Sequence, residues 1–414
     1  MGIKHKQSKN TIIEYPSDWE PKTFNQISYM KGRIGWQGLK KSEFTNNPDE
    51  PFLITGMNFK GGKIDWETVY HVSYERYEED EDIQLQNFDV LLTKDGTIGK
   101  LLYLEKIPPP GKATLNSHLL LLRPINNQYI PKFIYYVLNS RHFSKFIDYQ
   151  KSGSTFYGLT QSAMGKYKAV LPPIPEQRAI AEVLSDVDAL IEAQEALIEK
   201  KRLIKQGVMQ ELLTGKRRLP GFSGEWAKKS VSEMGIVITG GTPPTKNLEY
   251  WGGDVPWITP TDITRSRDIF CSERLITEKG LNYLHELPPD SVLVTCIASI
   301  GKNAILRTTG ACNQQINAVI PNENNNPEFL YYVFEHNKDY LLSNSGITAT
   351  RILSKNLFSS LIFNIPYYEE QKAISNILCD LEDEIFGLIE IKNKIRLIKQ
   401  GMMQELLTGR TRLV

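Results

Sequence analysis

The sequence lacks the features that mark several large classes of protein. Its 414 residues contain no apolar run near the ~20 residues that a helix needs to cross a bilayer. The stretch MGIKHKQSKN at the beginning is polar and has no apolar core of a secretory signal. We therefore expect a cytoplasmic protein with no membrane segment.

Cysteine and histidine are scarce. None of the four cysteines (Cys271, Cys296, Cys312 and Cys379) belongs to a CxxC pair, which indicates reduced thiols. The six histidines are scattered, so the sequence predicts no metal site. An excess of charge is also missing, because 49 Lys and Arg against 48 Asp and Glu leave a net charge of +1. This balance excludes a uniformly basic surface, although a local basic patch can still bind nucleic acid.

The sequence does contain a long internal repeat. RLIKQGVMQELLTGKRRL occupies residues 202–219, and RLIKQGMMQELLTGRTRL occupies residues 396–413. The register extends backwards without a gap, so that Gln177 aligns with Gln371. A repeat of this kind indicates that the chain is built from two similar halves.

Each copy of the repeat predicts a long helix. In both copies, apolar residues recur at the spacing of a heptad stripe. Prolines precede each copy, while Gly215 and Gly409 follow it, as is typical of helix entries and exits. The 37 or so residues from Gln177 to Leu213 would form a rod of roughly 55 Å at ~1.5 Å per residue.

A single apolar stripe needs a partner, and the simplest partner is the other copy of the repeat. Gly207 and Gly401 are expected at this contact, because both copies keep a glycine that costs a helix ~1 kcal/mol relative to Ala. A tolerated helix defect is the alternative interpretation of these glycines. The full set expected at the helix–helix contact is Ile180, Val187, Leu190, Leu197, Gly207, Ile374, Leu381, Leu388, Ile391 and Gly401.

The segments outside the helices echo each other faintly. Both carry a strand followed by a glycine turn, DVLLTKDGTIGK (89–100) and SVLVTCIASIGK (291–302). Both then carry a short aromatic helix, PKFIYYVLNS (131–140) and PEFLYYVFEH (327–336). The order of the elements is shared, while the residues in the turns differ.

The expected fold class is α+β, with two similar α/β globular domains joined by two long antiparallel helices in a pseudo-two-fold coiled coil. The expected boundaries are 1–171 for the first globular domain, 172–219 for the central helical spacer, 220–364 for the second domain and 365–414 for the C-terminal spacer. A fixed spacer with two divergent domains is suited to gripping a ligand at two points.

These stretches resemble a known family. PPIPEQRAIAEVL (172–184), the duplicated RLIKQG segment, PGFSGEW (220–226) and ITGGTPPTKNLEYWGGDVPWITPTDI (238–263) are similar to the specificity subunit of type I DNA restriction–modification systems. GRIGWQGLKKSEF (32–44) adds to the resemblance. The matching stretches lie in both halves of the chain.

The resemblance implies a non-catalytic DNA-binding subunit. Each globular domain would be a target-recognition domain that reads one half of a bipartite site in double-stranded DNA. The helix pair would set the unread gap and dock two methyltransferase subunits, and two restriction subunits would complete the complex. S-adenosylmethionine, ATP and Mg are expected on those partner subunits, and no cofactor or metal is expected in this chain.

Two short stretches resemble catalytic motifs only weakly. NIPY (364–367) resembles the loop of adenine methyltransferases but lacks the double proline and falls at the entry to a predicted helix. GTIGK (96–100) has the wrong spacing for a phosphate-binding loop. We therefore predict no catalytic residues.

The candidates for DNA contact are cationic and polar residues in the glycine turns and nearby loops, since such side chains bind phosphates and base edges. In the first domain they are Arg33, Trp36, Gln37, Lys40, Lys94, Thr97, Lys100, Ser154, Thr155 and Tyr157. In the second domain they are Thr242, Lys246, Ser299, Lys302, Asn303, Thr348, Thr350 and Arg351. Each of them has an ordinary structural alternative, such as a solvated turn or a core anchor.

Two other functions remain open from the sequence. One is the recognition half of a two-subunit or fused nuclease–methyltransferase with hidden catalytic residues, which would bind S-adenosylmethionine. The other is a two-headed protein-binding scaffold, which would show no salt-dependent DNA binding.

Overall fold

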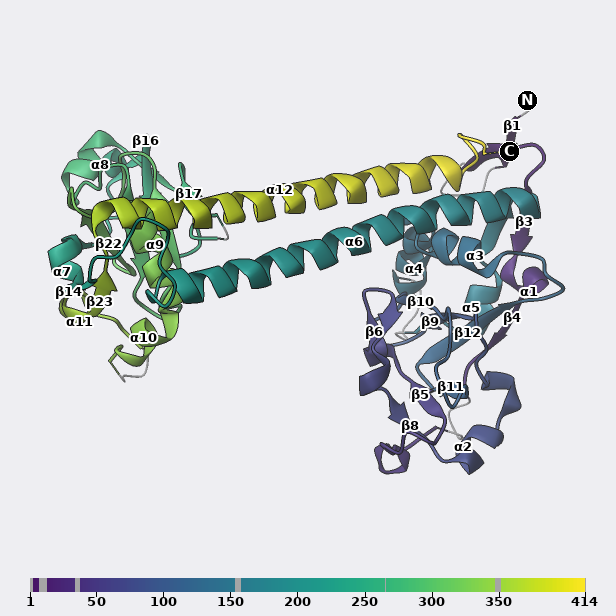
Figure 1. Cartoon of the computed structure of the whole chain (residues 1–414). Helices are drawn as coiled ribbons and strands as arrows, with labels where there is room; N and C mark the ends of the chain where they lie inside the picture. Colours follow the sequence, from purple (N-terminus) through teal and green to yellow (C-terminus); the bar gives the residue numbers. More distant parts are fainter. Residues whose placement is uncertain are drawn as a thin grey trace. The chain divides into compact units, whose positions relative to one another are not determined.

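The computed structural model describes residues 3–6, 13–33, 38–152, 158–264, 266–346 and 351–413. It divides into two compact units, residues 1–193 with 392–414 and residues 194–391 (Figure 1). Each unit therefore contains one globular domain and a part of each repeat helix. Seven of the predicted DNA-contact residues lie outside the described residues: Trp36, Gln37, Ser154, Thr155, Tyr157, Thr348 and Thr350.

The first unit is built around an antiparallel four-stranded sheet with the strand order β10-β9-β12-β4. Its strands are β4 (Ser28–Lys31), β9 (Val90–Thr93), β10 (Leu101–Tyr103) and β12 (Leu119–Pro124). A second sheet has the order β11-β5-β8, with β5 (Phe52–Ile54), β8 (Tyr70–His71) and β11 (Ala113–Leu115). Two-stranded pairs are β1 (Ile3–Lys6) with β2 (Ile13–Pro16), β3 (Glu20–Thr23) with β13 (Lys168–Leu171), and β6 (Phe59–Lys60) with β7 (Lys63–Ile64).

Helices cover this sheet on one face. They are α1 (Phe24–Ile27), α3 (Pro131–Leu138), α4 (Arg141–Ser152) and α5 (Gln161–Gly165). Helix α2 (Tyr74–Glu78) packs instead on the second sheet, where Tyr77 joins Leu53 of β5. Short 3-10 turns occupy Lys41–Glu43, Gly56–Asn58, Trp66–Thr68 and Glu81–Ile83. The run LLLL in β12 explains the two-sided burial, because alternate side chains of a strand point to opposite faces. Leu120 and Leu122 join the core with Phe133 of α3, while Leu119 and Leu121 join the core of the second sheet.

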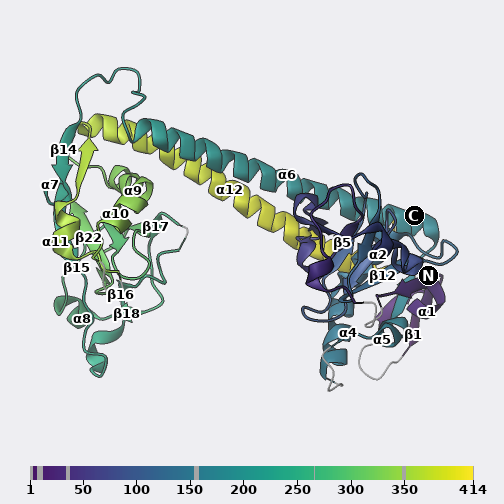
Figure 2. The ribbon, with the colours of Figure 1, turned by 90° about the horizontal axis from the view of Figure 1, so that it is seen from below.

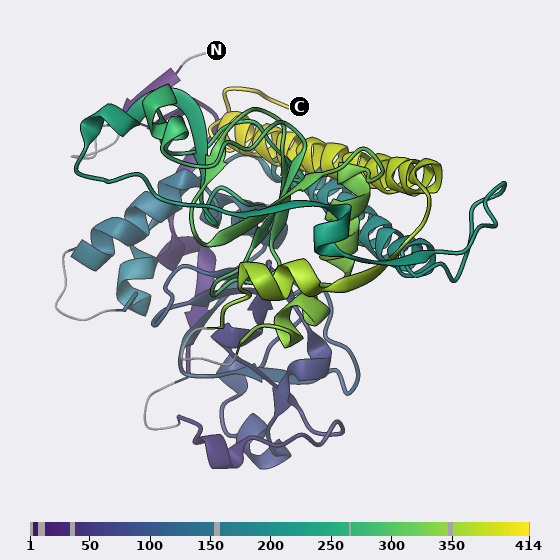
Figure 3. The same cartoon turned by 90° about the vertical axis from the view of Figure 1, so that its left-hand side faces the viewer.

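The second unit repeats this plan (teal to green in Figure 3). Its main sheet has the order β15-β22-β19-β20-β17, with β15 (Gly235–Thr239), β17 (Asp268–Ile269), β19 (Ser291–Thr295), β20 (Asn303–Leu306) and β22 (Ile316–Pro321). The second sheet has the order β18-β16-β21, with β16 (Trp251–Ile258), β18 (Leu275–Ile276) and β21 (Ala311–Cys312). β14 (Ala227–Ser230) pairs with β23 (Ile362–Ile365). The helices are α7 (Val231–Met234), α8 (Glu278–Asn282), α9 (Pro327–His336), α10 (Lys338–Ser343) and α11 (Lys355–Ser360), with a 3-10 turn at Leu248–Tyr250.

The two domains share one topology, as the sequence predicted. The order β10-β9-β12-β4 corresponds to β20-β19-β22-β15, and β11-β5-β8 corresponds to β21-β16-β18. Strand β17, which pairs in parallel with β20, has no counterpart among the strands described in the first unit.

The repeat forms two helices of equal length, α6 (Ile174–Leu212) and α12 (Tyr368–Leu406), with 39 residues each. In the first unit, Lys399 near the end of α12 binds Asp188 in the first half of α6 at 2.5 Å. In the second unit, Lys205 near the end of α6 binds Glu382 near the start of α12 at 2.5 Å. The segments that lie side by side in each unit therefore run antiparallel, which confirms the predicted pairing (Figure 2).

Glycine closes both helices in the way the sequence predicted. Gly215 and Gly409 adopt φ of 69° and 70°, a left-handed conformation that favours glycine. Their amides donate to the carbonyls of Leu212 and Leu406 at 3.4 and 3.2 Å. The glycine in each copy thus ends the helix and turns the chain out of it.

The buried seam of the helices differs in part from the predicted set. Ile180 and Ile374 are buried, and Val187, Leu381 and Leu388 are half-buried. Leu190, Leu197 and Ile391, in contrast, are 47%, 37% and 47% exposed, so a large part of each side chain lies outside the contact. The apolar stripe is therefore wider than the buried seam.

The two interior glycines do not mediate a close approach of the helices. A Cβ added at Gly207 or Gly401 would meet nothing within 4 Å. The packing interpretation of these glycines is therefore wrong, and both are exposed helix residues.

Candidate nucleic-acid interface

The glycine turn of the first unit is held in shape by Thr93, the last residue of β9. The Thr93 hydroxyl donates to the carbonyl of Thr97 at 2.5 Å and accepts from the amide of Lys100 at 2.9 Å. Gly99, at φ 93°, allows the chain to reverse between them. Thr97 and Lys100 consequently stand exposed on a turn whose backbone is internally bonded.

Two other loop segments meet this turn. The Lys94 amide donates to the carbonyl of His118, just before β12, at 2.9 Å. The amide of Leu159, which follows the loop from α4, donates to the Lys94 carbonyl at 2.6 Å. Burial lowers the pKa of the half-buried Lys94 ammonium. The structure thus brings the turn residues together with the segment that follows Ser154–Tyr157.

Arg33 was predicted to contact DNA, but its side chain is buried inside the first domain. Its side chain is 1% exposed, and it donates from Nε to the carbonyl of Leu115 at 3.0 Å and from a terminal nitrogen to Thr114 Oγ1 at 3.2 Å. Burial lowers the pKa of its guanidinium. The side chain binds the edge of the second sheet, so no surface of it is left for DNA in this structure. Lys40 is exposed and precedes the 3-10 turn Lys41–Glu43.

The second unit reproduces the turn with different residues. The Thr295 hydroxyl donates to the carbonyl of Ser299 and accepts from the amide of Lys302 at 2.9 Å. Gly301 adopts φ 88°. Lys302 is exposed, whereas Asn303 is 5% exposed and donates to Glu335 Oε2 at 3.2 Å. The prediction that Asn303 contacts DNA is thus wrong for this structure, because its side chain lies inside the domain.

The same neighbours gather around this second turn. The Ala298 amide donates to the carbonyl of Arg351 at 3.4 Å, which places the exposed Arg351 beside the turn. Thr242 Oγ1 donates to Gln314 Oε1 at 2.6 Å across the neighbouring loop. Lys246 is exposed on the loop that continues from Thr242. Each domain therefore presents loops from separate parts of its chain around one glycine turn.

A basic groove in the first unit was missed at the sequence level. It has a volume of about 750 Å³ and lies between the start of α4, strand β13 and the end of α12. Arg141, Lys145, Lys168 and Arg410 contribute to its lining, and none of its described lining residues is acidic. Among the described residues, no carboxylate forms an ion pair with Arg141, Lys145 or Lys168, whereas Arg410 pairs with Glu405. These residues are far apart in the sequence, so the charge pattern alone does not reveal the groove.

Each domain is fastened to the repeat helices by a matching arginine. Arg412 donates to both carboxylate oxygens of Glu176 at 2.5 and 2.7 Å and to Asp18, and it lies 5.7 Å from the Trp19 ring. In the second unit, the aligned Arg218 donates to both oxygens of Glu370 at 2.6 and 2.7 Å and lies 5.8 Å from the Trp226 ring. The two units therefore share a fastening as well as a topology.

A glutamine makes a second matching attachment. Gln177 accepts from the amide of Ile130 at 2.9 Å, and the aligned Gln371 accepts from the amide of Asn326 at 2.9 Å. Both glutamines also donate to the carbonyl of a proline that precedes their helix. The loop before α3 or α9 is thereby held against the start of the long helix.

The described residues contain no group of three or more His, Cys, Asp or Glu side chains that could hold a metal ion. None of the helices in the described part of the chain is long and apolar enough to span a membrane.

Two like domains, each fastened in the same way to a duplicated helix, define a two-headed recognition subunit. The sequence model of the type I restriction modification DNA specificity domain matches residues 16–200 and 223–397, once in each half. The chain therefore belongs to this family and carries two target-recognition domains. Specificity subunits of these systems recognise DNA and are not themselves catalytic.

Individual relatives agree with the family. The type I restriction enzyme MjaIX specificity subunit of Methanocaldococcus jannaschii is 36% identical over 188 residues, which are 44% of this chain and 43% of that protein. The putative MjaX specificity subunit of the same organism is 27% identical over 98% of this chain and 96% of its own length. The alignment with the first relative thus spans less than half of that protein, whereas the second is matched almost throughout.

Solved structures agree on the fold. The crystal structure of the type I restriction-modification S subunit from M. genitalium covers 98% of this chain and 99% of its own, with a TM-score of 0.58 at 15% identity. A chain from a study of complex assembly and conformational transition in a type I R-M system gives a TM-score of 0.56 at 16% identity.

Proposed function

We propose that this chain reads a bipartite target in double-stranded DNA, with one half-site for each globular domain. The single observation that carries the proposal is the repetition of one domain topology, with one fastening, on two copies of one helix. Divergent loops around a shared glycine turn, Lys94–Lys100 in one domain and Cys296–Lys302 in the other, support the reading of two different half-sites.

The helices supply the means to keep the half-sites apart. At ~1.5 Å per residue, a helix of 39 residues is about 58 Å long. DNA rises ~3.4 Å per base pair, so this length corresponds to at most about 17 base pairs. The major groove returns to one face of the duplex after each full turn of about 10.5 base pairs, so two reading surfaces on that face would meet major grooves about one turn apart. The target is therefore two short specified parts with an unread gap.

Docking of two methyltransferase subunits is supported by a duplicated exposed surface. Leu203 and its aligned residue Leu397 are 60% and 66% exposed, and Ile204 and Ile398 are 41% and 59% exposed. The same pair of large apolar side chains thus recurs on each helix, as two copies of one partner would require. Two restriction subunits would join the full complex, and S-adenosylmethionine, ATP and Mg would be bound by the partners in the cytoplasm.

Mapping of methylated adenines in cells with and without this gene tests the proposal. A bipartite motif with a constant gap should be methylated when the chain is present and unmethylated when it is absent. An unchanged methylation map, in cells that express the chain and its methyltransferase subunit, would refute the proposed function.

Binding experiments separate the alternatives. DNA retardation in the presence of methyltransferase subunits should weaken with rising salt, since phosphate contacts release counterions. A response independent of salt would favour a protein-binding scaffold. Measurable binding of S-adenosylmethionine to the isolated chain would favour a fused or two-subunit enzyme.

A further inference from the structure

In the second unit, a bridge of three side chains ties the globular domain to both repeat helices. Tyr332 of α9 donates to Glu382 Oε2 of α12 at 2.8 Å. Lys205 of α6 donates to Glu382 Oε1 at 2.5 Å, and its ammonium lies 5.1 Å from the centre of the Tyr332 ring. We call this set the second clamp.

The first unit has the equivalent set, which we call the first clamp. Tyr136 of α3 donates to Asp188 Oδ2 of α6 at 2.8 Å. Lys399 of α12 donates to Asp188 Oδ1 at 2.5 Å and lies 5.2 Å from the centre of the Tyr136 ring. The two long helices exchange roles between the clamps, since the carboxylate comes from α12 in one and from α6 in the other. Each clamp joins three elements, so it restrains the rotation of its domain on the helices.

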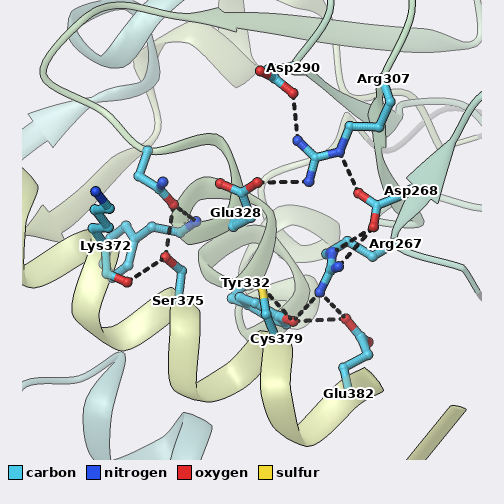
Figure 4. A network of polar contacts seen from close by, with 12 residues as sticks. Arg267, Asp268, Asp290, Arg307, Glu328, Tyr332, Lys372, Ser375, Cys379 and Glu382 are labelled. Carbon is cyan, nitrogen blue, oxygen red and sulfur yellow. Dashed lines mark hydrogen bonds and ion pairs between the residues drawn. The ribbon is translucent and has the colours of Figure 1, made fainter. Parts of the chain in front are cut away.

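The second clamp is braced by Arg267, and Figure 4 shows the arrangement. Arg267 donates to the Tyr332 hydroxyl at 3.3 Å and lies 3.5 Å from Glu382. On its other side it donates to Asp268 Oδ2 at 2.8 Å. Its side chain is 11% exposed, so the bracing contacts are largely shielded from water.

Arg307 extends this brace into the domain. It donates to Asp268 at 2.6 Å, to Asp290 at 2.5 Å and to Glu328 of α9 at 2.7 Å. Burial alone would raise the pKa of the Asp268 carboxyl, but hydrogen bonds from Arg267 and Arg307 outweigh it and hold that pKa below its usual value. The carboxylate is therefore charged at neutral pH and connects β17 and β20 of the sheet to α12 through the arginines.

Beside the first clamp, the described residues form a cleft, and the Tyr136 hydroxyl is hydrogen-bonded to Ser185 of α6 at 3.2 Å rather than to an arginine. The cleft has a volume of about 390 Å³, and Asp188, Lys399 and Tyr135 contribute to its lining. A nearby cross-connection is the pair Lys63–Glu192 at 2.7 Å, whose side chains are 66% and 48% exposed. Exposed pairs of this kind restrain little. Strand β17, which carries the brace in the second unit, has no counterpart among the strands described in the first domain.

We propose that Arg267 is a positioning residue that locks the second domain on the helix pair, and that the first domain is the more compliant reader. The inference rests on the proposed function, because its consequence is a strict gap length. A rotation of about 10° moves a surface roughly 20 Å from the pivot by about 3.5 Å, close to the ~3.4 Å rise of one base pair. Arg267 therefore sets how strictly the complex rejects sites with one base pair more or less in the gap.

The test uses the full chain assembled with its methyltransferase subunits and duplexes that carry the mapped target with its natural gap or with one base pair added or removed. Arg267→Met keeps the apolar stem of the side chain but removes the brace. We expect the ratio of methylation rates, natural gap over altered gap, to fall about tenfold, with the specified bases unchanged. An unchanged ratio would overturn the inference.

A matched control is available on the same helices. Lys201 binds Glu384 at 2.6 Å between α6 and α12, and neither residue belongs to the clamp. Lys201→Met should leave the gap ratio as in the wild type. If Arg267→Met does not fold, Tyr332→Phe removes one hydroxyl from the second clamp and should lower the ratio in the same direction; an unaltered ratio there would also contradict the inference.

The outcomes separate the proposed function from the positioning role of Arg267. A wild-type complex that methylates no bipartite target refutes the proposed function. A wild-type complex that is specific, with an Arg267→Met complex that loses rate equally on all gaps, refutes the positioning role and leaves the function intact.

Discussion

Removal of the Arg412 guanidinium should destabilise the first unit strongly. Arg412→Met takes two charge-assisted hydrogen bonds from Glu176, whose side chain is 0% exposed. The indole of Trp19 still donates to Glu176 at 3.2 Å, and Asp18 loses its partner at the surface. The variant therefore leaves a carboxylate in the interior with a single neutral donor.

The cost follows from that geometry. Breaking a buried ion pair by removal of one partner typically costs 3–5 kcal/mol, and the lower end applies here because Arg412 is itself 18% exposed. We expect a loss of about 3 kcal/mol in the free energy of unfolding. Arg218→Met should cost a similar amount in the second unit: Arg218 is 27% exposed, which lowers the cost, but Glu370 is 2% exposed and the Trp226 indole donates to none of the described residues, so Glu370 keeps no such donor.

Urea unfolding followed by tryptophan fluorescence measures both effects, because Trp19 and Trp226 lie beside the arginines. Arg202→Met is the matched control, since Arg202 pairs with Glu199 at 3.6 Å on an exposed helix face and should change stability by less than about 0.5 kcal/mol. If Arg412→Met is no more destabilising than this control, the Arg412 guanidinium does not stabilise the buried Glu176 carboxylate.

Three further outcomes are expected. Gly207→Ala should raise the free energy of unfolding by up to about 1 kcal/mol, because alanine favours the helix and the added methyl group meets no atom within 4 Å. Gly409→Ala should lower the free energy of unfolding, because Gly409 has a φ of 70° and an atom of Pro16 lies 2.5 Å from the new Cβ. Equal effects of the two variants in urea unfolding would contradict this expectation. Lys145→Gln should reduce the slope of log binding constant against log salt by about 0.9 if the basic groove holds a phosphate; an unchanged slope excludes the contact. The lowered pKa of Asp268 means that its stabilisation is present above the unfolded pKa of ~3.9 and is lost as pH falls through the folded value, so Arg267→Met should move acid unfolding of the second unit, followed by circular dichroism, to higher pH.

The architecture was predictable because the repeat determines it. Two nearly identical amphipathic segments favour each other as partners, and a helix exit at Gly215 and Gly409 follows from local backbone preference. The glycine turns were also predictable as a pair, since a threonine that ends a strand precedes each of them, Thr93 and Thr295.

The predictions that the structure does not bear out concern side chains whose surroundings depend on contacts between residues far apart in the chain. Arg33 is an ordinary DNA-binding residue by type, and its burial follows from the position of Leu115, some eighty residues later. The exposure of Leu190 follows from the width of the apolar stripe relative to the seam. Asn303 lies next to an exposed lysine but points inward to Glu335. The sequence around each of these residues does not indicate whether its side chain is buried or exposed.

The two clamps could be predicted from the sequence only in part. Lys205 and Lys399 occupy aligned positions of the repeat, as do Asp188 and Glu382, so a signal was present. Arg267 was not predictable, because its role depends on the added strand β17 and its parallel pairing with β20.

The most direct test of the central claim removes length from the helices. Deletion of residues 193–199 together with their aligned residues 387–393 shortens each helix by two turns, about 10 Å. Methylome mapping in cells that carry this variant should find the same two half-sites with a gap shorter by up to about three base pairs. Altered bases within either half-site, or an unaltered gap, would contradict the claim that the paired helices space two independent readers.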